Sequence, residues 1–195
     1  MFYILIIAIS MILIIGINVL LVFLGCIDSF SYLYAILAPI FNLIVIVLWE
    51  LAIAGIIHAF PAKYFSPYSK RFKIFDFERG LYEKSGIRKW KDYIPDSGQL
   101  CDFKKDELKS TEVEYLHKFL VEACYADAIH LWMGIGGFLI LLISIPYPVA
   151  LWTISFPIAF ISLLLNIPPL VIQRYNRPKL LKVYERMLKK EKKSS

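Results

Sequence analysis

The chain has 195 residues, of which 58% are apolar, and its formal net charge is +6. This apolar share exceeds the roughly 45–50% that is usual for soluble domains. All 22 lysines and arginines fall within residues 63–118 and 174–195. Because a charge at the centre of a bilayer costs about 2.5–3.5 kcal/mol, long uncharged stretches are typical of membrane-spanning segments. The composition excludes an ordinary soluble domain and predicts an all-α integral membrane protein with a single membrane domain.

Four apolar runs have the length of transmembrane helices, for which about 20 residues suffice. They cover residues 1–27, 32–60, 128–145 and 149–172. The first run has no basic region and no small-residue cleavage site, so we expect a retained helix and not a removed signal peptide. The Pro146-Tyr147-Pro148 string separates the third run from the fourth.

Basic residues set the expected orientation of these spans. Four spans place both termini and residues 63–118 on one side, and the two other connections have no lysine or arginine. The positive-inside rule therefore predicts cytoplasmic termini in a multi-pass protein of the cell membrane. Residues 63–118, with 13 basic and 10 acidic side chains, are expected to form an ordered, partly interfacial layer. Residues 174–195 predict a basic amphipathic helix that binds anionic membrane lipids, and no nucleic acid.

A first polar cluster alternates aromatic and charged side chains over residues 75–92. In Arg88-Lys89-Trp90-Lys91, the basic residues are suited to donate hydrogen bonds to a phosphate, and the tryptophan is suited to the membrane interface. Together with Glu78, this string predicts a cradle for an anionic headgroup or for a donor molecule. The alternative is that the segment only anchors the chain at the lipid headgroups.

A second cluster lies where the third span begins. On a helix, Asp127 and His130 are i, i+3 neighbours, and Glu122 lies about two turns before His130. A carboxylate beside an imidazole raises its basicity and fixes its tautomer, as a general base requires. The cluster therefore predicts catalytic roles for these three residues. The alternative is a satisfied interfacial histidine with an aspartate that caps the helix.

A third cluster closes the fourth span. Arg174, Asn176 and Arg177 lie between prolines, and the two arginines are spaced to clamp a phosphate or a carboxylate. The alternative is that they only stop transfer through the membrane. Within the second span, Glu50 is a candidate binding residue because an acidic group inside a membrane needs a reason to be there. His58, near the end of that span, is expected to meet lipid headgroups.

The three cysteines, Cys26, Cys101 and Cys124, are odd in number and show no CxxC spacing. Neither a disulfide scaffold nor a zinc site is expected, and no metal site is predicted. Small buried or interfacial residues are the simple interpretation, and a thioester-forming nucleophile is the alternative. Residues 95–98 predict a turn.

The clusters resemble the glycosyl-4,4'-diaponeurosporenoate acyltransferase family over about residues 58–182. The most specific strings are Arg88-Lys89-Trp90-Lys91 and Gln173-Arg174-Tyr175-Asn176-Arg177-Pro178. The resemblance implies a membrane enzyme that esterifies a fatty acyl group onto the sugar of a glycosylated carotenoid, in staphyloxanthin-type carotenoid biosynthesis. The family pattern has Glu where this chain has Asp127, and the first span looks like an extension relative to the shorter members.

The expected reaction is acyl transfer at the cytoplasmic face. His130, oriented by Asp127 or Glu122, would deprotonate a hydroxyl of a lipidic or glycosylated acceptor. The resulting oxygen would attack the carbonyl of an acyl donor such as an acyl-CoA or an acyl carrier protein, and no cofactor is expected. The basic residues of the first and third clusters would bind donor phosphates or the oxyanion. Two other functions compete: an isoprenylcysteine methyltransferase-like enzyme, and a lipid-binding or scaffold protein.

Overall fold

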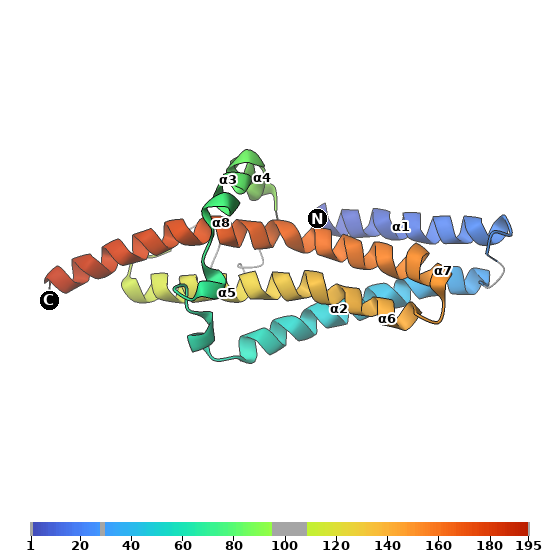
Figure 1. Cartoon of the computed structure of the whole chain (residues 1–195), viewed down its shortest axis with the longest axis horizontal. Coiled ribbons are helices and arrows are strands. Elements are labelled where there is room, and N and C mark those ends of the chain that lie inside the picture. Colours follow the sequence, from blue (N-terminus) through green and yellow to red (C-terminus); the bar gives the residue numbers. More distant parts are fainter. Residues whose placement is uncertain (1, 28–29, 95–108, 195) are drawn as a thin grey trace. The chain divides into compact units, whose positions relative to one another are not determined.

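The computed structural model describes residues 2–27, 30–94 and 109–194, and no strand occurs among them. The long helices are α1 (Phe2–Phe23), α2 (Tyr32–Ala59), α5 (Val113–Gly136) and α8 (Phe156–Ser194) (Figure 1). The short elements are η1 (Ala62–Phe65), η2 (Lys70–Phe72), α3 (Asp76–Lys84), α4 (Ile87–Trp90), η3 (Lys91–Tyr93), η5 (Gly137–Ile140), α6 (Leu141–Ser144), α7 (Pro148–Ala150) and the π-helical η6 (Leu151–Ser155). The predicted all-α class is confirmed. The predicted turn at residues 95–98 and Cys101 lie outside the described residues.

Four stretches of the described chain are helical, long and apolar enough to cross a membrane, as predicted. Two of these helices extend beyond the apolar spans that they contain. The third helix begins at Val113, so it includes Glu122 and Asp127, which we placed on one helix with His130. The fourth continues through Pro168, Pro169 and Pro178 to Ser194, so the last apolar span and the basic C-terminal segment form one helix. A proline removes one backbone donor, and a long helix that packs against neighbouring segments tolerates that loss.

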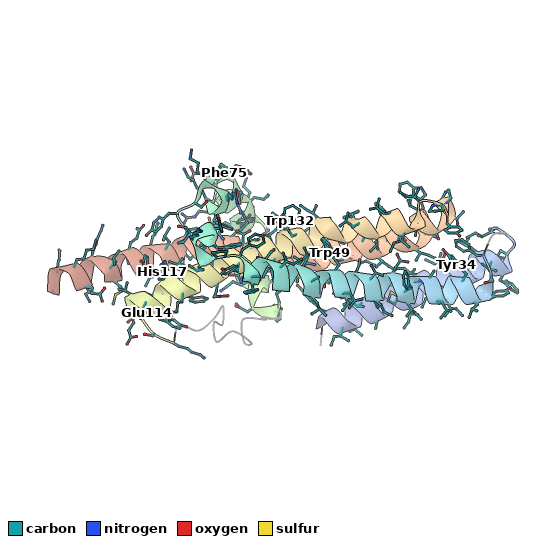
Figure 2. All side chains as sticks on the ribbon, turned by 90° about the horizontal axis from the view of Figure 1, so that it is seen from below. Tyr34, Trp49, Phe75, Glu114, His117 and Trp132 are labelled. Atoms are coloured by element: carbon teal, nitrogen blue, oxygen red, sulfur yellow. The ribbon has the colours of Figure 1, made fainter. Side chains whose placement is uncertain are left out.

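The chain divides into two compact units, and residues 1–55 with 132–166 form unit 1. Its core consists of buried isoleucines and small residues from α1, α2, η5, η6 and α8, among them Ile14, Ile46 and Ile154. Polar side chains inside this core pair with one another: the hydroxyl of Thr153 donates to Asn18 Oδ1 at 2.7 Å. Figure 2 shows apolar side chains projecting outward along α1. Unit 1 thus has a small interior in which polar side chains such as Asn18 and Thr153 pair, and it has an apolar surface.

Residues 56–131 and 167–195 form unit 2. It holds α3, α4 and their flanking turns, with the end of α2, most of α5 and the second half of α8. Ile87, Ile172 and Tyr175 form a buried cluster, against which Tyr82 and Trp90 pack. This cluster fixes α3 and α4 beside α8 (Figure 1). All the predicted site residues except Glu50 belong to unit 2.

Candidate active site

Glu78 and Arg174 form a two-point ion pair between α3 and α8. Arg174 Nε donates to Glu78 Oε2 at 2.9 Å, and Arg174 Nη2 donates to Glu78 Oε1 at 2.8 Å. The side chains are 17% and 13% exposed, so little water competes for these bonds. The hydroxyl of Tyr82, one turn after Glu78, donates to Glu78 Oε2 at 2.8 Å. Paired bonds of this fork geometry are among the strongest that a carboxylate makes.

Asp127 on α5 joins both arginines of the third cluster. Its Oδ2 accepts from Arg177 Nη1 at 2.6 Å and from Arg174 Nη1 at 3.3 Å. The side chains of Arg177 and Asp127 are 2% and 5% exposed. Arg177 Nη2 also donates to the carbonyl of Phe72 at 2.7 Å, and the guanidinium lies 5.3 Å from the centroid of the Phe72 ring. We call Glu78, Asp127, Arg174 and Arg177 the arginine–carboxylate network.

Local sequence explains how these elements meet. Arg174 and Arg177 are i, i+3 on α8 and therefore point to one side of the helix. Glu78 lies in the first turn of α3, where the helix dipole favours an acidic group. Gly86 adopts φ +70 between α3 and α4, a left-handed backbone that glycine tolerates without strain. This turn returns the chain so that both short helices lie against α8.

The pKa values of two side chains on α3 are shifted, those of Glu78 and of its neighbour Tyr82. Burial alone would raise the pKa of Glu78, but hydrogen bonds from Arg174 and Tyr82 and the charge of Arg174 outweigh it and lower that pKa below its ordinary value. Burial raises the pKa of Tyr82, and its hydrogen bond to Glu78 raises it further. Glu78 is thus held as a carboxylate and Tyr82 as a neutral phenol that donates to it.

The two arginines of the third cluster lie close together, and their partners belong to the protein itself. We expected Arg174 and Arg177 to present their guanidinium edges to a ligand, whereas those edges bind Glu78, Asp127 and the Phe72 carbonyl. The reason is burial, since a guanidinium withdrawn from water needs a carboxylate of its own. Asn176, between them, is half-buried. A role of these residues in donor binding stays a prediction.

Asp127 was predicted to orient His130. In the structure, Oδ2 of Asp127 accepts hydrogen bonds from the two arginines. His130 is half-buried on α5 in unit 2. Its role as general base stays a prediction, as does a contribution from Asp127.

Glu122 has a different imidazole partner from the one predicted. Its Oε2 lies 3.6 Å from Nε2 of His58, whereas His130 is eight residues away on the same helix, about 12 Å by helical rise. The ring of His58 stacks on Tyr125 with centroids 5.0 Å apart, and the hydroxyl of Tyr125 donates to the Phe60 carbonyl at 2.7 Å. We expected His58 to meet lipid headgroups. Its pairing with Glu122 was not predictable, because no local pattern links residues 64 positions apart.

The basic string of the first cluster lies on the surface of unit 2. Arg88 is 73% exposed; its Nε donates to the hydroxyl of Tyr175 at 3.1 Å, and it lies 3.6 Å from Glu83. Lys89 is exposed, and Lys91 lies 3.5 Å from Asp92. Trp90 is half-buried and donates from its indole to the Ser85 carbonyl at 3.1 Å. The string is accessible to a ligand, and its binding role stays a prediction.

Glu50 lies in unit 1, where two side chains satisfy it. Its Oε1 accepts from the hydroxyl of Ser162 at 2.9 Å and from Nδ2 of Asn166 at 3.2 Å. These bonds explain how an acidic residue resides in an apolar helix, and a substrate-binding role for Glu50 stays a prediction.

Metal-binding groups and cysteines offer no further site in the described part of the chain. No cluster of three or more histidine, cysteine or acidic side chains suited to a metal ion occurs there. Cys124 is fully buried and Cys26 is exposed.

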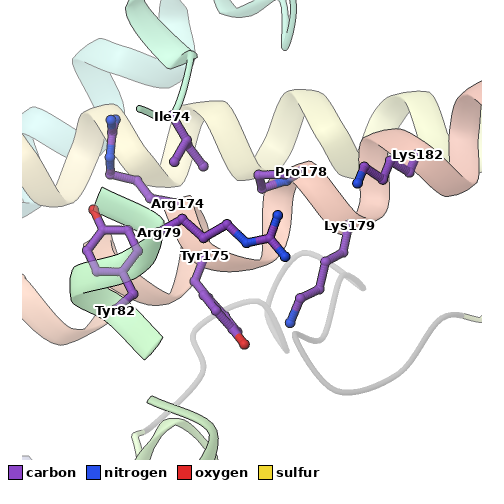
Figure 3. A pocket seen from close by; sticks show the side chains of 8 residues that line it. All are labelled: Ile74, Arg79, Tyr82, Arg174, Tyr175, Pro178, Lys179 and Lys182. Carbon is purple, nitrogen blue, oxygen red and sulfur yellow. The ribbon is translucent and has the colours of Figure 1, made fainter. Parts of the chain in front are cut away.

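A small cavity opens between α3 and α8 (Figure 3). It measures about 50 Å³. Eight described residues line it: Ile74, Arg79, Tyr82, Arg174, Tyr175, Pro178, Lys179 and Lys182. We call it the basic pocket. The pocket was not predictable from the sequence, because its residues come from two segments that are far apart in the chain.

Residues 61–186 match the family described as glycosyl-4,4'-diaponeurosporenoate acyltransferase. The chain belongs to this family. A relative of that name from Staphylococcus haemolyticus is 27% identical over 147 residues, which cover 73% of this chain and 82% of the relative. Relatives of the same name from Staphylococcus aureus are 31% identical in strain Newman, covering 73% of this chain and 84% of the relative, and 32% identical in strain COL, covering 67% and 78%. No solved structure was found to match.

The predicted family is thereby confirmed, and with it the prediction of an acyltransferase. The matched residues include the whole arginine–carboxylate network and the basic pocket. Glu50 and His58 precede the match. The part of the chain that identifies the family is therefore the part that builds the arginine–carboxylate network and the basic pocket.

Proposed function

We propose that this chain is a multi-pass acyltransferase of the cell membrane that moves a fatty acyl group onto a hydroxyl of a glycosylated lipid, such as a glycosyl carotenoid. The observation that carries the proposal is the family match over residues 61–186, which contains a buried network of two arginines and two carboxylates. The relatives are named as acyltransferases of glycosyl-4,4'-diaponeurosporenoate. Their named acceptor is the basis for the acceptor proposed here.

Membrane insertion is supported by the surface of the long helices. Apolar side chains such as Ile4, Ile12 and Leu51 are 66% exposed or more, and lipid would remove them from water. The proposed topology has four spans, with both termini and residues 63–118 in the cytoplasm. The apolar helices would hold the acyl chain and the lipidic acceptor, and the charged residues of unit 2 would meet the head of the donor.

The proposed reaction transfers the acyl group from a thioester. An imidazole removes the proton of the acceptor hydroxyl, and that oxygen attacks the acyl carbonyl. The new carbon–oxygen bond forms as the carbon–sulfur bond breaks, and the imidazolium returns its proton to the departing thiolate. The donor is an acyl-CoA or an acyl carrier protein, and no cofactor takes part.

Two imidazoles of unit 2 are proposed for the role of base. His130 is favoured by its sequence position beside Asp127. His58 is favoured by geometry, because Glu122 lies 3.6 Å from its Nε2 and Tyr125 fixes its ring plane. A carboxylate beside the imidazolium that forms during the reaction stabilises it. His117 supplies a matched control, since it is exposed on α5 and packs 5.9 Å from the ring of Tyr184.

The test uses the full chain in lipid nanodiscs with palmitoyl-CoA and a glycosyl carotenoid, and mass spectrometry detects the ester. We expect ester formation by the wild type and a loss of about 10²–10⁴-fold in H130A or in H58A, with H117A unchanged. Full activity of both H130A and H58A would contradict the proposal that an imidazole acts as the base. Absence of any ester product, with S-adenosylmethionine bound instead, would overturn the acyltransferase proposal.

A further inference from the structure

The side chains that line the basic pocket carry mainly positive charge. Four of its lining side chains are cationic, and among the described residues that line it none is acidic. Arg174 is already neutralised by Glu78 and Asp127. The surplus positive charge therefore comes from Arg79, Lys179 and Lys182, which the mechanism above does not use.

The surplus cations approach the cavity from two helices. Arg79 comes from α3 and lies 3.6 Å from Glu83, a pairing weakened by 63% exposure of the arginine. Lys179 comes from α8, and its ammonium lies 3.8 Å from the centroid of the Tyr175 ring. An aromatic face attracts a cation and holds it in place without neutralising its charge. Lys182 is exposed one turn further along α8.

The remaining lining groups add polar contacts and fix the walls. The hydroxyl of Tyr175 accepts from Arg88, and the hydroxyl of Tyr82 donates to Glu78. Both rings therefore have set positions. Figure 3 shows the side chains of Tyr175, Lys179 and Lys182 on α8, with those of Arg79 and Tyr82 from α3.

The size of the pocket limits what can enter. A cavity needs about 10–15 Å³ to hold one water molecule, so the 50 Å³ of the basic pocket hold a few groups of that size. Cofactor-sized ligands occupy pockets of about 300–1,000 Å³. The pocket can take one phosphate group, with the rest of the ligand outside it.

We propose that the basic pocket binds a phosphate group of the acyl donor, through Arg79, Lys179 and Lys182. The donor is then a CoA thioester or a phosphopantetheine thioester, and the pocket holds its phosphate while the acyl chain lies elsewhere. The inference rests on the proposed acyl transfer for its choice of ligand. A phosphate of a membrane lipid has the same chemistry, so the experiment separates the two sources.

The kinetic arm compares two donors of the same acyl chain, palmitoyl-CoA and palmitoyl-pantetheine, which has no phosphate. For wild type we expect kcat/KM to be at least tenfold higher with palmitoyl-CoA. In the K179Q/K182Q variant this preference should shrink to near unity through a rise in the KM for palmitoyl-CoA. The control K84Q/K118Q removes the same charge from exposed lysines outside the pocket and should keep the wild-type preference. An unchanged preference in K179Q/K182Q would overturn the proposal.

The binding arm needs no turnover. Titration of CoA into wild type in nanodiscs of neutral lipid should show binding that weakens about tenfold or more in K179Q/K182Q and not in K84Q/K118Q. If wild type binds CoA in this lysine-dependent way but forms no ester, the pocket inference stands and the proposed function fails. If CoA binding is equal in all three proteins, the pocket inference fails, whatever the activity.

A final arm replaces neutral lipid by nanodiscs with phosphatidylglycerol. The donor assignment would be overturned if this lipid competes with CoA in wild type and if the binding of both depends equally on Lys179 and Lys182. The phosphate site would then belong to a lipid headgroup. Undiminished CoA binding in anionic nanodiscs supports the donor.

Discussion

Removal of Arg177 should destabilise unit 2 more than any other single change to the arginine–carboxylate network. Arg177 is 2% exposed, donates to Asp127 at 2.6 Å and donates to the Phe72 carbonyl at 2.7 Å. In R177M, Asp127 keeps only the longer 3.3 Å contact with Arg174, and the Phe72 carbonyl loses this donor. Loss of one partner of a buried ion pair costs about 3–5 kcal/mol.

R177K tests how much of this cost depends on the shape of the guanidinium. A lysine restores the positive charge but has one nitrogen, so it cannot reproduce both bonds of the fork. A hydrogen bond to a charged group contributes about 1.5–3 kcal/mol, and we expect R177K to lose one such bond. The exposed Arg186, about two and a half turns further along α8, gives the matched control R186K, which should be neutral.

The assay is thermal unfolding in detergent, with the free energy of unfolding from denaturant titration as a second measure. For a chain of this size, about 1 kcal/mol shifts Tm by roughly 2–4 °C. R177M should therefore lower Tm by about 6–20 °C, and R177K by about 3–12 °C. In a double-mutant cycle, D127N should recover part of the loss in R177M, because it removes a buried carboxylate that has lost its closest partner. A wild-type Tm for R177M would refute the network as a structural element.

Two further predictions concern charge and topology. The pKa of Glu78 is lowered on folding, so its ion pair stabilises the protein above the ordinary carboxyl pKa and is lost as pH falls through the lowered value. The difference in unfolding free energy between wild type and E78Q should thus be largest near pH 7 and shrink below about pH 4. For topology, single cysteines at residues 97 and 195 of a cysteine-free variant should react from the cytoplasmic side; labelling of either from outside would contradict the four-span arrangement.

The helices of this chain were predictable because they depend on local composition. Uncharged apolar runs located four helices of spanning length, and the specific strings around Arg88 and Arg174 located the family. The boundaries were less predictable. The third helix extends upstream of its apolar span to Val113, through charged residues that are compatible with a helix and contain no glycine or proline to interrupt it.

The pairing of charged side chains was not predictable from spacing. Neighbours along a helix suggested Asp127 with His130, whereas Asp127 binds arginines 47 and 50 residues away. Glu122 likewise binds His58 across 64 positions. Burial decided the partners of Asp127, because a charge withdrawn from water takes the best opposite charge that folding brings near. Equality of number is visible only in the folded protein, where two arginines pair with two carboxylates.

Because the two arginines and the two carboxylates of the network neutralise one another, they differ from the lysines of the basic pocket, whose charges are available to a ligand. Glu78 and Asp127 cancel Arg174 and Arg177, so the network has no net charge to offer to a phosphate, and an incoming anion would have to displace a carboxylate held at 2.6 to 2.9 Å. Lys179 and Lys182 carry no such cost. The arginine variants should therefore lose activity together with stability, whereas K179Q/K182Q should weaken donor binding at an unchanged Tm. A loss of donor affinity in R177K at wild-type Tm would reverse this division and restore the arginines as the phosphate clamp that their spacing first indicated.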